Sequence, residues 1–306
     1  MDLGLRGKVA VVTGASKGMG RWTALEFARE GADVVVVARG AEALASVAGQ
    51  IEALGVRALA VPADLATAAG TEELFDRVRG DFGGCDILVN TLGSDEYDYL
   101  PLTETSDELF QAHLDIGLMA GVRTCRAAIG LMRARGGGAI VNLAAMSIRK
   151  QYPTMVAYTA AKAALASVSK NLARAHGPDG IRVNTICPGA ILTEGVREKI
   201  EQFGPGRWVA PDALAASAST SSTTAASSTT AASRTTGASS TTVAPSTEEV
   251  FLAISRDMGG AGRGLVPDLG RPGRPEEIAA AIVFLCSARA GYITGALLNV
   301  DGGSDF

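Results

Sequence analysis

Short runs of apolar, often β-branched residues alternate along the chain with longer segments whose apolar positions recur at helical spacing. The apolar runs predict strands over residues 9–13, 33–38, 58–62, 86–90, 139–143, 182–187 and 296–300. The segments between them predict helices over about 20–30, 42–54, 106–135 and 158–176. Two further helices are expected to begin at Thr71, as the N-cap of an acidic first turn, and at Pro275.

The strand runs are apolar on both faces and are separated by helices, which is typical of a parallel sheet with right-handed crossovers. The sequence therefore predicts an α/β protein with a doubly wound parallel sheet, the Rossmann fold, and helices on both faces. A chain of 306 residues is an ordinary length for one such domain, and we expect a single domain over 1–306.

One segment departs from this alternation. Residues 215–240 are Ser, Thr or Ala at every position except Arg234 and Gly237. Such a segment has no large apolar side chain to bury, so folding cannot offset its loss of conformational entropy. We expect a low-complexity insertion at about 211–247, a mobile insertion or linker or a poorly ordered lid, within a lid region over 194–270.

Composition narrows the class of protein. The net charge is −4 and no Lys/Arg cluster falls on a predicted helix face, which argues against nucleic acid as the main partner. The amino-terminal residues lack a signal pattern and no apolar run approaches 18 residues, so we expect a soluble cytoplasmic protein without a membrane partner. The expected partner is a small-molecule substrate.

The potential metal ligands are few and scattered. The four cysteines show no C-x-x-C spacing and most lie in apolar runs, so we expect buried, reduced thiols and no metal site. The two histidines, His113 and His176, fall on predicted helices, where a surface or capping role is favoured over catalysis.

A glycine-rich turn follows the first strand and leads into a helix. Gly14, Gly18 and Gly20 are spaced for a tight turn, a close backbone approach to a pyrophosphate and close packing of helix on strand. The amide groups at the start of the helix would then face the phosphates. A glycine trio alone is weak evidence, but this one lies in the strand–turn–helix context that dinucleotide binding needs.

The residues after the second strand favour NADP(H) over NAD(H). NAD sites place an acid about 20 residues beyond the glycines, whereas residues 34–38 carry none and Arg39 follows at once. Lys17 lies inside the turn, and two cations suit a 2′-phosphate. The alternative is that Arg39 is an ordinary solvated loop cation. Asp64, at the end of the third strand, is expected to accept from the adenine amino group.

Five motifs together resemble the short-chain dehydrogenase/reductase family. They are T-G-A-S-K-G-M-G (13–20), N-T-L-G (90–93), Y-x-x-x-K (158–162), P-G-A-I-L-T (188–193) and L-N-V-D-G-G (298–303). The match extends over nearly the whole chain apart from the insertion. The resemblance implies about seven parallel strands and a homo-oligomer, a tetramer or dimer. It also implies cofactor contacts from Gly14, Ser16, Lys17, Gly18, Met19, Gly20, Arg39, Asp64, Leu65, Asn90, Gly93, Tyr158, Lys162, Pro188, Gly189, Ile191 and Thr193.

Tyr158 and Lys162 suggest the chemistry, because four residues apart on a helix they share one face. A free tyrosine ionises near pH ~10, and a neighbouring ammonium stabilises the phenolate and brings its pKa toward the working range. Tyr158 would then protonate a carbonyl oxygen as hydride arrives, or deprotonate an alcohol in the reverse direction. By resemblance, Lys162 also holds the nicotinamide ribose, Asn90 supports the cofactor-binding strand, and Ile191 and Thr193 contact the carboxamide.

Two expected active-site residues are missing. The family carries a serine thirteen positions before the tyrosine and an asparagine in a D-x-N-L pattern, where this chain has Ala145 and Gly117. The first interpretation is an atypical NADP-dependent carbonyl reductase or alcohol dehydrogenase in which Ser147 or Tyr152 supplies the lost hydrogen bond; either can equally be an ordinary loop residue. The alternatives are non-redox chemistry, as a lyase, isomerase or cyclase, and cofactor binding with little activity.

The loop at residues 95–99 carries three acids and follows the fourth strand, near the mouth of the expected pocket. These acids disfavour a strongly anionic substrate close by, unless the loop is only a solvated surface segment.

Overall fold

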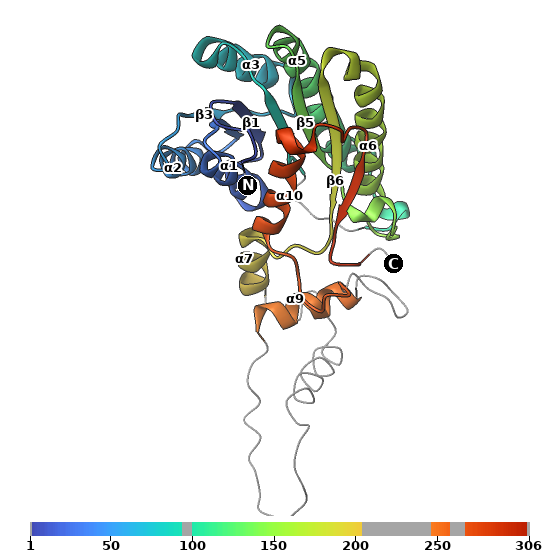
Figure 1. The fold of residues 1–306 in the computed structure, drawn as a ribbon. Helices are drawn as coiled ribbons and strands as arrows, with labels where there is room; N and C mark the ends of the chain where they lie inside the picture. Colours follow the sequence, from blue (N-terminus) through green and yellow to red (C-terminus); the bar gives the residue numbers. More distant parts are fainter. Residues whose placement is uncertain (1, 94–99, 204–245, 258–266, 305–306) are drawn as a thin grey trace, which may run out of the picture.

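The computed structural model describes residues 2–93, 100–203, 246–257 and 267–304, and these contain a seven-stranded, wholly parallel sheet (Figure 1). Its strand order is β3-β2-β1-β4-β5-β6-β7. The strands are β1 Val9–Thr13, β2 Asp33–Ala38, β3 Ala58–Pro62, β4 Ile87–Asn90, β5 Gly138–Leu143, β6 Ile181–Pro188 and β7 Leu297–Val300. The order reverses between β1 and β4, which confirms the predicted doubly wound fold.

Helices cover both faces of the sheet because successive strand residues point to opposite sides. In β1, Ala10 and Val12 enter one core with α1, α2 and α10, whereas Val9 and Val11 enter a second core with α3, α5 and α6. These helices are α1 Gly18–Arg29, α2 Ala41–Glu52, α3 Ala68–Phe82, α5 Ala120–Ala134, α6 Val156–His176 and α10 Pro275–Cys286. Short 3-10 turns are η1 Leu102–Glu104, η3 Met146–Ile148, η4 Gly177–Asp179 and η6 Ala288–Ala290.

The predicted start of the third helix at Thr71 is wrong. The helix begins three residues earlier, at Ala68, and its N-cap is Thr67, whose hydroxyl accepts a hydrogen bond from the Gly70 amide. Thr71 is buried one turn into the helix. Both threonines can cap a helix, and the choice depends on Thr67 following the loop that leaves β3.

The long helix predicted over 106–135 has the expected extent but is not uniform. Ser106 caps α4, Asp107–Leu114, by accepting from the Leu109 amide. A π-helical stretch, η2 Asp115–Met119, then separates α4 from α5. Gly117 lies in that stretch, facing α6.

Two helices lie beyond the carboxyl edge of the sheet (Figure 1). They are α7 Glu194–Phe203 and α9 Thr247–Asp257, and they pack on each other through Ile200, Val250 and Ala253, with Leu192 from the segment before α7 in the same cluster. The predicted insertion at about 211–247 lies outside the described residues except at its end, where Ser246 precedes α9 and Thr247 is its first residue. The acidic loop at 95–99 also lies outside them.

All four cysteines are buried and free, which confirms the predicted burial. Burial raises the pKa of the Cys85, Cys125 and Cys286 thiols to about 12. In the described part of the chain, the helices are too short or too polar to cross a membrane. His, Cys, Asp and Glu side chains within that part form no group of three that could hold a metal ion.

Candidate active site

A cavity of about 820 Å³ opens at the carboxyl edge of the sheet and extends from the glycine turn to the lid helices. Nearly all the residues predicted from sequence line it. These are Gly14, Ser16, Lys17, Gly18, Met19, Gly20, Arg39, Asp64, Leu65, Gly93, Ser147, Tyr152, Tyr158, Lys162, Pro188, Gly189, Ile191 and Thr193. The cavity therefore brings together side chains that the sequence spreads over some 180 positions.

The glycine turn fits a phosphate group. Helix α1 begins at Gly18, and Gly18, Met19 and Gly20 of its first turn line the cavity. A helix amino terminus of this kind favours an anion, and here the Gly18 amide donates to the carboxylate of Glu194 at 3.2 Å. A Cβ at Gly20 would overlap the carbonyl oxygen of Gly14, which explains why no larger residue can close this turn. Thr91 fixes the neighbouring strand end, since its hydroxyl donates to the Thr13 carbonyl at 2.5 Å.

The two cations predicted near the ribose both reach this part of the cavity. Lys17 and Arg39 are exposed side chains of its lining, and Asp64 lines the same end. The four residues of β2 between Asp33 and Ala38 are all valines. No carboxylate from that strand interior stands where it would repel a phosphate.

Asn90 lies beneath the cavity rather than in its lining. It is buried at the end of β4, donates to Asn142 Oδ1 at 2.8 Å and accepts from Thr124 Oγ1 at 2.9 Å. Asn142 in turn donates to Ser169 Oγ at 2.8 Å. Asn142 was not predicted, although a second asparagine near the end of an apolar strand was a visible signal. The two asparagines are paired in the sheet register.

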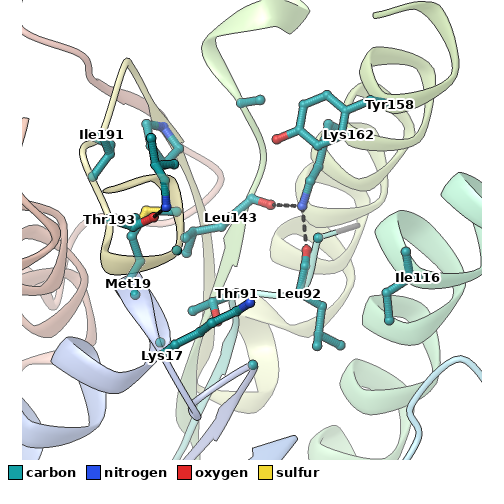
Figure 2. A pocket seen from close by; sticks show the side chains of 18 of the residues that line it. Lys17, Met19, Thr91, Leu92, Ile116, Leu143, Tyr158, Lys162, Ile191 and Thr193 are labelled. Atoms are coloured by element: carbon teal, nitrogen blue, oxygen red, sulfur yellow. Dashed lines mark hydrogen bonds between the residues drawn. The ribbon is translucent and has the colours of Figure 1, made fainter. Parts of the chain in front are cut away.

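Tyr158 and Lys162 lie side by side on α6 (Figure 2). The Lys162 ammonium is buried, donates to the carbonyl oxygens of Leu92 at 2.7 Å and Leu143 at 3.0 Å, and lies 5.8 Å from the centre of the Tyr158 ring. Burial lowers the pKa of Lys162 from 10.5 to about 8. The site thus holds a cation next to a phenol whose oxygen points into the cavity.

Ala145 faces the cavity where a hydroxyl was expected, and the nearest hydroxyl in sequence is that of Ser147. Ser147 lines the cavity, is 2 % exposed, and accepts a hydrogen bond from Thr159 Oγ1 at 3.0 Å. Since its oxygen accepts that bond, its own proton can be donated elsewhere. Tyr152, the other candidate, is also buried and lines the cavity.

Gly117 does not leave a vacant place for an asparagine. A Cβ at this position would lie 3.0 Å from the Cβ of Ala161, the neighbour of Lys162 on α6. A larger side chain here would require the facing helix to give by a few tenths of an ångström. Glycine is therefore a packing residue in this chain.

The prediction of a surface or capping role was wrong for His113. Its side chain is buried, and its ring meets the Tyr158 ring edge-on with centres 6.2 Å apart. This follows from the packing of α4 against α6, which periodicity alone did not reveal. His176 lies at the end of α6, where its Nδ1 is 2.9 Å from Asp179 Oδ2.

Glu194, the first residue of α7, was not anticipated. Its carboxylate accepts from the Gly18 amide at 3.2 Å, Trp22 Nε1 at 3.0 Å and Arg21 Nη1 at 3.4 Å. These bonds fasten the lid helix to the first turns of α1. The sequence offered only a negative residue after the P-G-A-I-L-T motif, with no sign of its partners.

Comparison with known proteins identifies the family. The family model for short chain dehydrogenases matches residues 8–203, and a second model, named for enoyl-(acyl carrier protein) reductase, matches 258–305. D-threitol dehydrogenase of Mycolicibacterium smegmatis is 34% identical over 307 residues, covering 99% of this chain and 94% of that protein. The chain belongs to the short-chain dehydrogenase/reductase family and is an oxidoreductase of that type.

Solved structures agree with this assignment. L-sorbose reductase from Gluconobacter frateurii, solved with NADPH and L-sorbose, superposes with a TM-score of 0.76 at 34% identity, covering 100% of this chain and 99% of that one. A 7α-hydroxysteroid dehydrogenase, solved with NADH and 7-oxo glycochenodeoxycholic acid, gives a TM-score of 0.74 at 27% identity, covering 99% and 96%. One similar protein thus holds NADPH and the other NADH, so the family resemblance supports a nicotinamide cofactor of either kind.

Proposed function

We propose that this protein is an NADP(H)-dependent oxidoreductase that reduces a carbonyl group or oxidises a secondary alcohol, with Tyr158 as its acid and base. The observation that carries the proposal is the buried Lys162 ammonium, 5.8 Å from the Tyr158 ring, in the same cavity as the glycine turn. A nearby positive charge stabilises the phenolate that proton donation leaves behind.

The cofactor would be held by residues on the sheet side of the cavity. The amides at the start of α1 suit its diphosphate, Lys17 and Arg39 suit a 2′-phosphate, and Asp64 suits the adenine. Pro188, Gly189, Ile191 and Thr193 line the stretch toward Tyr158, where the nicotinamide and its ribose would lie. When bound in its reduced form, this cofactor supplies the hydride that the protein itself cannot provide.

The protein's own part in the reaction is proton transfer and orientation. As the carbonyl carbon gains a hydride, the phenol of Tyr158 gives its proton to the carbonyl oxygen and becomes a phenolate, and an alcohol is formed. In the reverse direction the phenolate takes the alcohol proton. Lys162 holds its charge next to the phenol, fixed by the carbonyl groups of Leu92 and Leu143.

Ser147 is proposed to supply the hydrogen bond that Ala145 cannot. Thr159, next to Tyr158 on α6, donates to the Ser147 oxygen and so directs the Ser147 proton toward another acceptor. A substrate oxygen within reach of Tyr158 would be such an acceptor. Tyr152 is the alternative donor, from the same part of the cavity lining.

The proposal is tested by measuring NADPH oxidation against a panel of ketones. We expect turnover, and a Tyr158→Phe variant should lose about 10²–10⁴-fold in kcat with its NADPH affinity unchanged. NADPH binding without turnover would contradict it. Two alternatives would then remain: a lyase, isomerase or cyclase, which the replacement of the usual serine and asparagine by Ala145 and Gly117 favours, and a protein with little activity. Analysis of the products formed without net oxidation or reduction of the cofactor would separate them.

The preference for NADP(H) has its own test. In Arg39→Ala we expect about a tenfold weaker NADPH affinity and little change in NADH affinity, because only NADPH carries the 2′-phosphate. Arg57→Ala is the control, since this exposed arginine lies on the ring of Phe82, at 4.2 Å from its centre. Equal losses for both cofactors would contradict the preference.

The remaining features of the proposal concern organisation. We propose one Rossmann-type domain over 1–306 with residues 194–270 as the lid, supported by the packing of α7 on α9 and by their place in the cavity lining. We propose a homo-oligomer, tetramer or dimer, from the family resemblance, and a cytoplasmic location from the amino-terminal sequence and the absence of long apolar runs. Size-exclusion chromatography with light scattering tests the oligomeric state.

A further inference from the structure

The wall of the cavity on the lid side is formed by apolar side chains from segments distant in sequence. Val196 and Ile200 come from α7, Phe251 comes from α9, and Met146 and Met155 lie in η3 and directly before α6. Ala145 continues this apolar surface toward Tyr158. A substrate whose reacting carbon lies near Tyr158 would therefore place its body against hydrocarbon.

This wall is continuous with a small hydrophobic core. Ile200 is buried with Leu192, Val250 and Ala253, and Val196 and Phe251 pack against the same cluster. The side chains that line the cavity thus also hold α7 and α9 together. Replacing one of them with a polar residue would disrupt packing as well as change the lining, so the wall is apolar for two reasons.

Among the residues that the structure describes, few polar groups line this side, and several are already engaged. The Ser147 oxygen accepts from Thr159, and Ser255 donates its hydroxyl proton to the Phe251 carbonyl at 2.8 Å. Lys199 is the one charged side chain that the described parts of α7 and α9 place in the lining. A polyol buried here would leave several hydroxyls without partners, which is costly.

We propose that the substrate is a carbonyl compound, or the matching alcohol, with a bulky alicyclic or aromatic body rather than a ketose or another polyol. This inference rests on the proposed function, because Tyr158 sets where the reacting carbon lies. The carbonyl carbon gains hydride from the reduced nicotinamide and the oxygen gains the Tyr158 proton. The hydrocarbon body lies against Val196, Ile200 and Phe251.

Binding, rather than turnover, tests the substrate class. Calorimetry on the full chain loaded with NADP⁺ would compare 1-decalone, a bicyclic ketone, with fructose. We expect 1-decalone to bind about tenfold more tightly or better, because its rings remove apolar surface from water against the wall. Fructose binding as tightly as 1-decalone, or more tightly, would overturn the proposal.

A matched pair of variants locates the effect. Phe251 lines the cavity, whereas its neighbour Val250 is buried in the same cluster but is not part of the lining. Phe251→Ala should weaken 1-decalone binding about tenfold, and Val250→Ala should leave it within about twofold. Equal weakening in both variants would show that only the packing of the lid matters and would overturn the assignment of Phe251 to the substrate wall.

The outcomes for the two proposals are separable. If neither NADPH nor NADP⁺ binds the wild-type protein, the proposed function fails and this inference with it. If 1-decalone binds the loaded protein as expected but NADPH is not consumed with it or with any other carbonyl, the redox assignment fails while the apolar substrate class stands.

Discussion

The two walls of the cavity are built from different parts of the chain. The wall toward the sheet is rich in glycine and includes the glycine turn, the start of α1 and the segment at Ile191. That segment is held by backbone hydrogen bonds between Leu192 and Gly273 at 2.9 Å and between Gly273 and Ala190 at 2.9 Å. The wall toward the lid is made of side chains, among them Val196 and Phe251, from separate helices.

This difference explains where the chain departs from its family. Backbone contacts to a common cofactor constrain residue type, because only glycine closes the turn at Gly20. A wall of side chains can change one residue at a time while the sheet remains intact. Of the two positions that differ from the family pattern, Ala145 lies in the cavity lining and Gly117 lies in η2 against α6, so neither belongs to the glycine turn. The cofactor side can therefore be conventional while the chemistry next to it has been altered.

The largest effect that would sharpen this comparison is expected at Ser147. If Ser147 donates to the substrate oxygen, Ser147→Ala should slow hydride transfer about 10²–10³-fold in single-turnover measurements, with NADPH affinity unchanged. Ala145→Ser introduced into that variant should restore part of the rate, and Ala145→Ser alone should speed the wild type. Ser167→Ala, on the exposed side of α6, is the control. A normal rate in Ser147→Ala would mean that Tyr152, and not Ser147, donates the hydrogen bond to the substrate oxygen.

The second effect concerns the buried ammonium group of Lys162. Lys162 has a pKa of about 8 in the folded protein and 10.5 as its ordinary value. Below pH 8 the lysine is charged in both states, and the buried charge lowers the free energy of unfolding by about 3 kcal/mol. Between pH 8 and 10.5 the folded state has released the proton and the unfolded state has not, so stability rises with pH.

Denaturant unfolding of wild type and Lys162→Met across that range measures this effect. The free energy of unfolding of the wild type, minus that of Lys162→Met, should increase by about 3 kcal/mol as the pH rises from 8 to 10.5. The buried thiols of Cys85, Cys125 and Cys286 titrate with the opposite sign, but they are common to both proteins and cancel. A difference that stays flat with pH would mean that the ammonium is not destabilised by burial.

The smallest effect is expected at Glu194, beside the wall toward the sheet. Its carboxylate lies at the amino end of α1, where the diphosphate is expected. Glu194→Gln keeps an oxygen acceptor for Trp22 but removes the negative charge, so NADPH should bind about two- to fivefold more tightly at low salt. Glu198→Gln, one turn further along α7, should have no effect. Weaker binding would mean that fastening the lid outweighs charge repulsion.

The sequence predicted the sheet because strand position follows from local apolar runs. Three strands, β1, β2 and β3, have the predicted bounds, and the others agree within one residue. The residues that line the wall toward the sheet were likewise predicted, from the glycine spacing and the motifs around Tyr158 and Ile191. Their contacts with a cofactor stay a prediction. In both cases the necessary information lies within a few neighbouring positions.

The parts that could not be predicted depend on contacts between distant segments. His113 had to be placed against Tyr158 by the packing of α4 on α6, and Glu194 had to meet Trp22 across more than 170 residues. The π-helical stretch at Asp115–Met119 has no periodic signature of its own. The choice of Thr67 over Thr71 as a helix cap required the path of the preceding loop.

The close approach of Gly117 to Ala161 has a consequence for redesign of this site. A Cβ at position 117 would lie 3.0 Å from the Cβ of Ala161, so an asparagine there would require the facing helix to give by a few tenths of an ångström. A smaller residue at 161 would remove that contact. An asparagine at 117 is therefore best introduced together with a second, permissive change at 161, and the two positions behave as one unit in any attempt to alter the chemistry.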